Sequence, residues 1–169
     1  MNAFELMYER LADSIVKHLD FERISVILEA GCGRGQLTMP FVRKVHKIKE
    51  NFKVIALDFS SGPYEGDLDI LKEKMRREKL DKVVVAVKGD VKNMKTIEDE
   101  SVDLIISNEL FCELDKKGLE RAIKEFYRIL KPSGQMAHGE LSPIPENEAQ
   151  RLVIEANAYS LETSQPKPE

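Results

Sequence analysis

The sequence predicts an α/β fold, in which a doubly wound sheet of parallel strands in the order 3-2-1-4-5 carries helices on both faces. Two observations predict it. Short apolar runs alternate with segments of helical periodicity, a rhythm that builds parallel sheets through right-handed crossovers. The first four runs, which lie at 27–29, 53–58, 82–90 and 102–108, each end in an acidic or polar residue. Such residues belong where the carboxyl ends of parallel strands form a ligand site.

The loop after the first strand holds three glycines at alternate positions, Gly31, Gly33 and Gly35. Glycine allows a sharp turn with positive φ and lets a ligand approach the backbone without a Cβ in the way. The dinucleotide fingerprint needs its third glycine one residue later, where this chain has Gln36. The spacing therefore favours a nucleotide ligand other than NAD.

Acidic residues at the next strand ends indicate how such a ligand would be held. Asp58 lies about twenty residues beyond the glycine loop, where nucleotide-binding sheets place a carboxylate that accepts hydrogen bonds from ribose hydroxyls. Asp90 and Asn108 end the third and fourth strands. Either aspartate could instead cap the turn that follows it.

Helical periodicity appears in four places besides a short C-terminal segment. The N-terminal helix, 1–20, has Phe4, Met7, Leu11, Ile15 and Leu19 at helical spacing, and it either covers the sheet or partly covers the substrate side. Further helices are marked by apolar residues at 37–48, 68–75 and 119–130. Pro40 is tolerable only near the first turn of its helix, and Pro132 and Gly134 stop the last of these helices.

Five segments in this order resemble the S-adenosylmethionine-dependent methyltransferases with a Rossmann-like fold. The resemblance covers the core, 24–141, and its motifs are EAGCGRG, ALDFS, KGDVKNM, DLIISNEL and RILKPSGQM. The last motif is similar to the family's Leu-Lys-Pro-Gly-Gly turn, with Ser133 in place of one glycine. The small-molecule branch of the family is the nearest in pattern.

The resemblance implies that the chain binds S-adenosylmethionine and releases S-adenosylhomocysteine. Its methionine end would lie on Glu29, on the glycine backbone and near Asn108, and its ribose on Asp58. Phe59 would pack on the adenine, whose edge Asp90 and the Val91 backbone would contact. The implied cofactor-binding residues are thus Glu29, Gly31, Gly33, Gly35, Asp58, Phe59, Asp90, Val91 and Asn108. Phe59 could equally be an ordinary core residue.

The acceptor side is less well marked. The ends of the fourth and fifth strands would flank the methyl group, which makes His138 and Glu109 the candidate catalytic residues, with Cys112, Glu113 and Glu140 nearby. His138 has an ordinary pKa suited to a base near neutrality, but a lone histidine in a strand is more often structural. No Asn-Pro-Pro-aromatic run follows the fourth strand, so methylation of a nucleic-acid base is disfavoured.

Two functions of different class therefore stay open. One is a methyltransferase whose acceptor is a small molecule or, less in keeping with the pattern, a protein. The other is a domain that binds S-adenosylmethionine without turnover, as a sensor or partner subunit. Carboxyl, hydroxyl, amine and thiol acceptors all remain compatible with the sequence.

Composition indicates the cellular location, the state of the cysteines and the kind of partner that we expect. Of the 169 residues 42% are hydrophobic, and no apolar run approaches the ~20 residues of a membrane span, so we expect a cytoplasmic protein. Two cysteines without a clustered histidine predict free thiols and no metal site. A formal charge of −4 argues against a broad nucleic-acid footprint.

We expect a single domain over 1–162 and a disordered tail over 163–169, because SQPKPE has nothing to bury. The family's sheet normally continues into two further strands that this sequence lacks. The chain is then either cut short after its fifth strand or a reduced form, and the first interpretation accords better with the prolines at its end.

Overall fold

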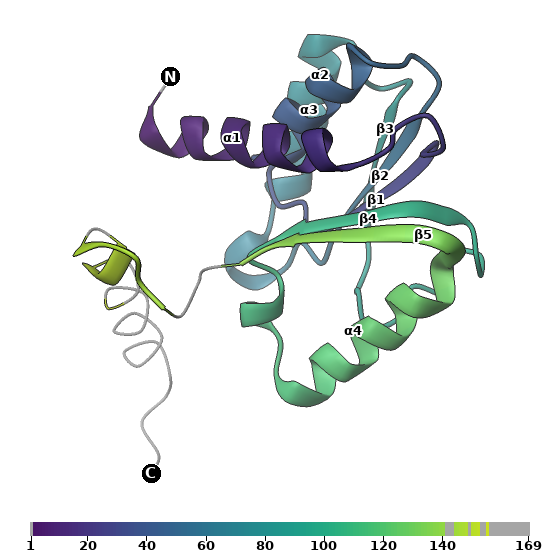
Figure 1. Ribbon diagram of the computed structural model, residues 1–169. Coiled ribbons are helices and arrows are strands. Elements are labelled where there is room, and N and C mark those ends of the chain that lie inside the picture. Colours follow the sequence, from purple (N-terminus) through teal and green to yellow (C-terminus); the bar gives the residue numbers. More distant parts are fainter. Residues whose placement is uncertain (1, 141–143, 149, 153–154, 156–169) are drawn as a thin grey trace. The chain divides into compact units, whose positions relative to one another are not determined.

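A computed structural model describes residues 2–140, 144–148, 150–152 and 155, and it contains one five-stranded parallel sheet (Figure 1). The strand order is β3-β2-β1-β4-β5, as the sequence predicts. The strands are β1 (Val26–Ala30), β2 (Lys53–Asp58), β3 (Val84–Lys88), β4 (Val102–Asn108) and β5 (Leu130–Gly139). From β1 the chain continues to β2 and β3 on one side of the sheet, and then returns to β4 and β5 on the other side of β1. The winding therefore reverses between the neighbouring strands β1 and β4, and the site lies there.

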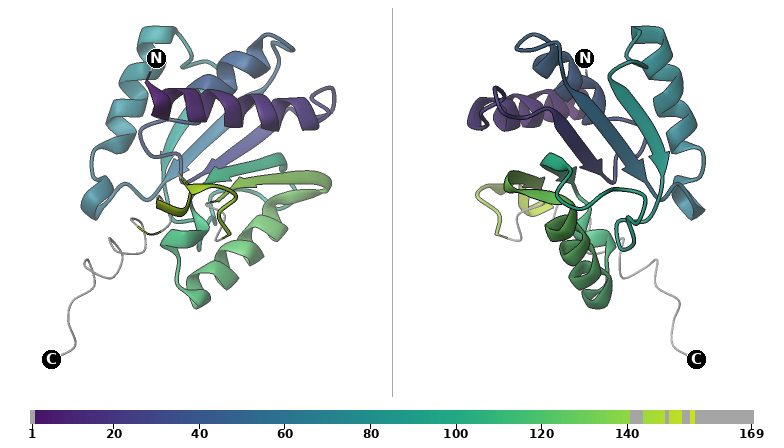
Figure 2. Two further views of the ribbon diagram at one scale, coloured as in Figure 1. Left: turned by 60° about the vertical axis from the view of Figure 1, so that its left-hand side comes forward. Right: turned by 90° about the vertical axis from the view of Figure 1, so that its right-hand side faces the viewer.

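Helices cover both faces of this sheet (Figures 1 and 2). Helix α1 (Ala3–His18), α2 (Thr38–His46) and α3 (Asp67–Glu78) pack on one face, and α4 (Lys116–Ile129) packs on the other. Two 3-10 turns, η1 (Gly62–Tyr64) and η2 (Phe111–Glu113), follow β2 and β4. Pro40 lies in the first turn of α2, as required.

The alternation of side chains along the strands divides the core into two layers. Ile27 of β1 packs into the layer under α1, α2 and α3, whereas Leu28 packs into the layer over α4. Both are fully buried. Strands buried on both faces explain the near-continuous apolar runs from which they were predicted.

Helix α1 forms as predicted, and three of the five residues of its predicted apolar face, Leu11, Ile15 and Leu19, pack in or against the core. Asn2 caps it through a capping box with Glu5. Tyr8, Ala12 and Ile15 are buried, while Phe4 and Met7, which we expected to be buried, are exposed. Tyr8 is buried although the periodicity did not predict it. Its ring is apolar and its hydroxyl has polar neighbours, a combination that periodicity alone does not weigh.

The join between α4 and β5 also departs from the predicted helix end and turn. The helix ends at Ile129 and β5 begins at Leu130. Its pairing with β4 then jumps, since Val102 is opposite Leu130 but Leu104 is opposite Gln135. The predicted turn, around Pro132 and Gly134, thus interrupts the strand instead of preceding it.

The chain divides into two compact units, 1–139 and 140–169. The first unit contains the whole sheet and every element above. The expected end of the domain at 162 and the tail over 163–169 lie outside the described residues, so both stay predictions.

Candidate functional site

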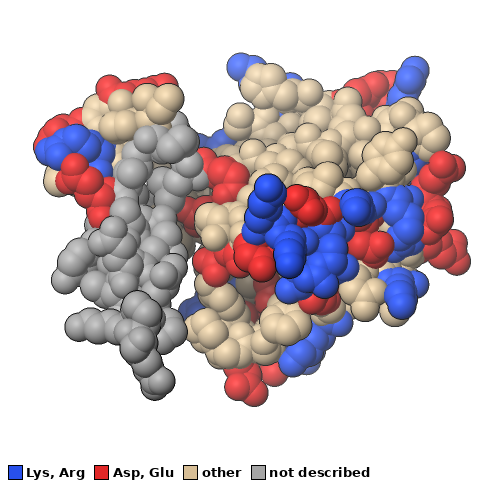
Figure 3. Space-filling model, turned by 90° about the horizontal axis from the view of Figure 1, so that it is seen from below, with Lys and Arg blue, Asp and Glu red and all other residues tan. Residues whose placement is uncertain are grey.

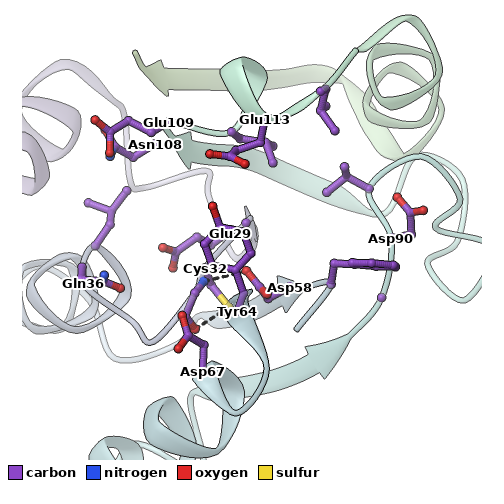
Figure 4. Close-up of a pocket in the computed structure, with 18 of the residues that line it drawn as sticks. Glu29, Cys32, Gln36, Asp58, Tyr64, Asp67, Asp90, Asn108, Glu109 and Glu113 are labelled. Carbon is purple, nitrogen blue, oxygen red and sulfur yellow. Dashed lines mark hydrogen bonds between the residues drawn. The ribbon is translucent and has the colours of Figure 1, made fainter. Parts of the chain in front are cut away.

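A cavity of about 360 Å³ opens at the carboxyl ends of the strands (Figure 4). It is lined by the ends of β1, β2 and β4, by the loops after β1, β2, β3 and β4, and by one residue each of α1 and α3. Nine of the eleven residues predicted for the site line it together: Glu29, Gly31, Gly33, Asp58, Phe59, Asp90, Val91, Asn108 and Glu109. Positions 25 or more residues apart in sequence therefore converge, as the topology requires.

Gly35 and His138 are not among the described residues that line the cavity. Gly35 instead faces Leu71 of α3 and Met39 of α2. His138 lies in β5, where its Nδ1 is 2.6 Å from the Ser107 hydroxyl and its ring stacks on Phe126. This packing accounts for the position of His138 without a catalytic role, and its role as the base stays a prediction.

Asp58 holds the glycine loop in place. Its Oδ2 accepts a hydrogen bond of 2.8 Å from the Gly33 N–H, and its Oδ1 accepts one of 2.7 Å from the Ser60 N–H. The N–H groups of Gly31 and Cys32 are bonded to the Leu57 carbonyl. Asp58 therefore does cap its turn, and since a carboxylate has about four lone-pair sites, each oxygen can still accept a bond from a ligand.

Glu29 is the most perturbed acid of the cavity. Only 2% of its surface is exposed, and its Oε2 has no hydrogen-bond partner among the described residues. Burial raises the pKa of this carboxyl to about 8, an increase that Thr38 opposes and the charge of Asp58 reinforces. A buried carboxyl oxygen without a partner is costly, and here it faces a cavity that a ligand could fill.

The end of the cavity near β3 combines the aromatic ring of Phe59 with the charged side chains of Lys92 and Asp90. Phe59 is 60% exposed, so it is not the core residue that the sequence also allowed. Lys92 Nζ lies 5.9 Å from the centre of the Phe59 ring and 3.4 Å from Asp90 Oδ2. Val91 is buried beside them. An exposed aromatic ring at the edge of a cavity is a surface on which a flat ligand group can stack.

The end near β4 is formed by Asn108, Glu109 and Tyr8. Glu109 has a φ of 50°, which is unusual outside glycine, and its N–H donates a 2.7 Å bond to the Gly139 carbonyl that holds it there. The pKa of the Tyr8 phenol is raised, chiefly by burial and next by the Glu109 charge. Since Tyr8 belongs to α1, that helix covers part of the site as well as the sheet.

Five polar residues of the lining were not predicted: Tyr8, Gln36, Tyr64, Asp67 and Lys92. Asp67 is buried at the start of α3 and forms a 2.8 Å ion pair with Arg34 of the glycine loop. Glu113 also lines the cavity, and its charge, after burial, raises the pKa of Tyr64. The acids in the first turn of a helix, Asp67 and Asp69, were a visible signal, because they suit the positive end of its dipole.

Neither Cys32 nor Cys112 is part of a disulfide. Cys32 is buried within the glycine loop, and burial together with the nearby Glu29 charge raises its pKa well above the usual range. It is thus a neutral spacer.

Within the described residues, no cluster of His, Cys, Asp and Glu could hold a metal ion. None of the described helices has the length and apolar content that crossing a membrane demands.

Gly35→Ala should destabilise the protein by about 2 kcal/mol. The residue has a φ of 83°, and an added Cβ would lie 2.6 Å from Leu71 Cδ1. Gly66→Ala is the matched control, since its φ is 87° but nothing lies within 4 Å of its Cβ position. Urea unfolding of both variants measures the difference. Equal losses would show that strain of the backbone, and not contact with α3, fixes Gly35.

Residues 27–134 match the protein family described as a methyltransferase domain. The chain belongs to the S-adenosylmethionine-dependent methyltransferases with a Rossmann-like fold. The family predicted from the five motifs is therefore confirmed, as is S-adenosylmethionine as its cofactor.

Individual relatives agree with this membership. An uncharacterized methyltransferase of Schizosaccharomyces pombe is 34% identical over 113 residues, which are 67% of this chain and 38% of that protein. A tRNA N(3)-methylcytidine methyltransferase of the same organism is 31% identical over 64% of this chain and 34% of its own length. A crystal structure from Methanococcus maripaludis, assigned as an S-adenosyl-L-methionine-dependent methyltransferase, is 25% identical with a TM-score of 0.68 and covers 95% of this chain and 66% of its own.

The matched segment spans well under half the length of these two curated relatives. Their acceptors thus do not transfer to this chain with the fold.

Proposed function

We propose that this chain transfers a methyl group from S-adenosylmethionine to a small-molecule acceptor held at the β4 end of the cavity. The observation that carries the proposal is the convergence of Glu29, Asp58 and the glycine backbone on one cavity at the switch point of the sheet. These groups suit a ligand that has both a ribose and a charged amino-acid end.

The residues present fit this cofactor. The unpartnered Oε2 of Glu29 can accept a hydrogen bond from an ammonium group, and Asn108 lies at the same end of the cavity. Asp58 can accept bonds from two hydroxyls while it keeps its two backbone partners. The exposed ring of Phe59 can stack on the adenine, next to Asp90 and Val91.

When bound, S-adenosylmethionine supplies a sulfonium methyl group that a nucleophile can take up in line. The protein contributes positioning and exclusion of water, which can be worth ~7–11 kcal/mol when the geometry is good. Tyr8, Leu110 and Leu114 line the cavity and keep part of it dry. Glu109 is the acid best placed to act on the acceptor, because it follows β4 directly and lines the cavity.

A small acceptor accords with the surface charge. On the side of α4, Lys and Arg cluster but Asp and Glu lie directly beside them (Figure 3). A nucleic-acid backbone is bound by a basic surface, and this face together with a net charge of −4 gives little of one. We therefore keep a small molecule as the acceptor and a protein as the second choice.

Calorimetric titration with S-adenosylmethionine, S-adenosylhomocysteine and NAD tests the proposal. We expect the first two to bind at one site per chain and NAD to bind far more weakly, because the glycine spacing departs from the pyrophosphate-binding fingerprint. Tighter binding of NAD than of the methyl donor would overturn it.

Phe59→Ala should weaken binding of S-adenosylhomocysteine by roughly 1–3 kcal/mol, the usual contribution of one base stacked on an aromatic ring. The control is Tyr127→Ala, which removes an 85% exposed ring on α4. Fluorescence or calorimetric titration of both variants gives the comparison. If the two lose the same affinity, Phe59 does not contact the adenine.

A further inference from the structure

The cavity holds more negative charge than its cofactor can balance. Six carboxylates line it, namely those of Glu29, Asp58, Asp67, Asp90, Glu109 and Glu113, whereas Lys92 is the one Lys or Arg among the described lining residues. Lys92 is paired with Asp90, and Arg34, from outside the lining, is paired with Asp67. Glu29 is largely protonated at neutral pH because its pKa is about 8.

Three acids are left, and they do not have equal surroundings. Asp58 accepts two backbone hydrogen bonds. Glu109 and Glu113 form no ion pair with a described basic residue, and Figure 4 shows both along one wall, across the cavity from Asp58 and Asp67. S-adenosylmethionine has two positively charged groups, a sulfonium and an ammonium, and one negatively charged carboxylate. The cofactor can therefore offset the negative charge of only one of these three acids.

The two glutamates also have aromatic neighbours. Tyr8 lines the cavity within range of the Glu109 charge, and Tyr64 lines it within range of the Glu113 charge. Carboxylates flanked by aromatic rings are a recurrent way to bind ammonium groups, through ion pairing and cation–π attraction together.

We propose that the methyl acceptor carries a protonated amine, which binds between the carboxylates of Glu109 and Glu113 and against the rings of Tyr8 and Tyr64. The inference rests on the proposed function for the identity of the site. A carboxylate acceptor would be repelled by both glutamates. A neutral acceptor would leave both carboxylates without a counter-charge.

The test uses the protein saturated with S-adenosylhomocysteine and three probes of similar shape: trimethylammonium, tert-butanol and trimethylacetate. Binding is measured by calorimetry or by shifts in amide NMR resonances. We expect trimethylammonium to bind at least tenfold more tightly than either of the other probes. Glu109→Gln and Glu113→Gln should each weaken that binding tenfold or more, whereas the control Glu120→Gln, an exposed acid of α4, should not.

Affinity for S-adenosylhomocysteine is measured first on the same samples, so that two failures can be told apart. Loss of that affinity in the unaltered protein would contradict the proposed function. If S-adenosylhomocysteine binds but trimethylammonium does not bind better than its neutral analogue, the amine proposal is wrong. It is equally wrong if both Gln variants bind trimethylammonium as the unaltered protein does.

Discussion

Glu29→Gln should remove a fall in stability that the ligand-free protein shows as the pH rises from 4.5 to about 8. The folded state keeps its proton on Glu29 up to a pKa of about 8, whereas the unfolded chain releases it near 4.5. Over this interval the folded state binds more protons, so stability is full below the lower value and is lost as the pH rises through the upper one. The slope approaches about 1.4 kcal/mol per pH unit.

The glutamine variant has nearly the same shape and no charge to bury. Above pH 8 it should therefore be more stable than the unaltered protein by several kcal/mol, of the order that this slope gives over the interval. The measurement is urea unfolding at a series of pH values, with Glu120→Gln as the exposed control. Acids with lowered pKa, such as Asp103 and Glu125, act in the opposite direction and mainly below this window.

A slope that persists in Glu29→Gln would show that another group titrates, and that the cavity solvates Glu29 well. If the slope is absent in the Glu29→Gln variant, the unaltered protein tolerates a costly acid at the end of its first strand. Such tolerance is typical of groups kept for a ligand, since the cost is offset only when a cation arrives.

The order of the strands was predictable because alternating apolar runs and helical segments are typical of doubly wound sheets, which share this strand order. Each parallel strand is an apolar run, and each crossover needs a segment long enough to return. The acids at 58 and 90 could be found for the same reason, since the carboxyl ends of parallel strands meet at one edge of the sheet.

The parts of the site that escaped prediction come from helices and turns packed against that edge. Tyr8 belongs to α1 and Tyr64 to η1, and nothing in their local sequence says which strand end they will meet. The same holds for Gly35, whose spacing matches its neighbours but whose Cβ position faces α3. Periodicity identifies an element, but packing decides which of its residues face the ligand.

His138 is the opposite case, a residue that was predicted for the site but is not among the described residues that line the cavity. Its residue type and its place in the fifth strand fit a catalytic base, yet the alternation of the strand turns its ring toward Phe111 and Phe126. Residue type and strand do not say which face of the sheet a side chain occupies, and a shift of one residue in register reverses that face.

Asp58→Ala should weaken binding of S-adenosylhomocysteine by roughly 3–6 kcal/mol, because two hydrogen bonds to a charged group are lost at about 1.5–3 kcal/mol each. The same change also leaves the N–H groups of Gly33 and Ser60 without their partner. We therefore expect a separate loss of stability of about 1–3 kcal/mol in the ligand-free protein.

The two losses separate the roles of Asp58. Asp69→Ala serves as the control, since it removes an aspartate whose side chain is 81% exposed on α3. Urea unfolding without ligand measures the structural role, and calorimetry under folding conditions measures the binding role. Lower stability with unchanged affinity would make Asp58 a brace for the glycine loop alone. Lost affinity in a variant that still unfolds cooperatively would establish the ribose contact, because a brace that merely loosened could not cost binding energy on that scale.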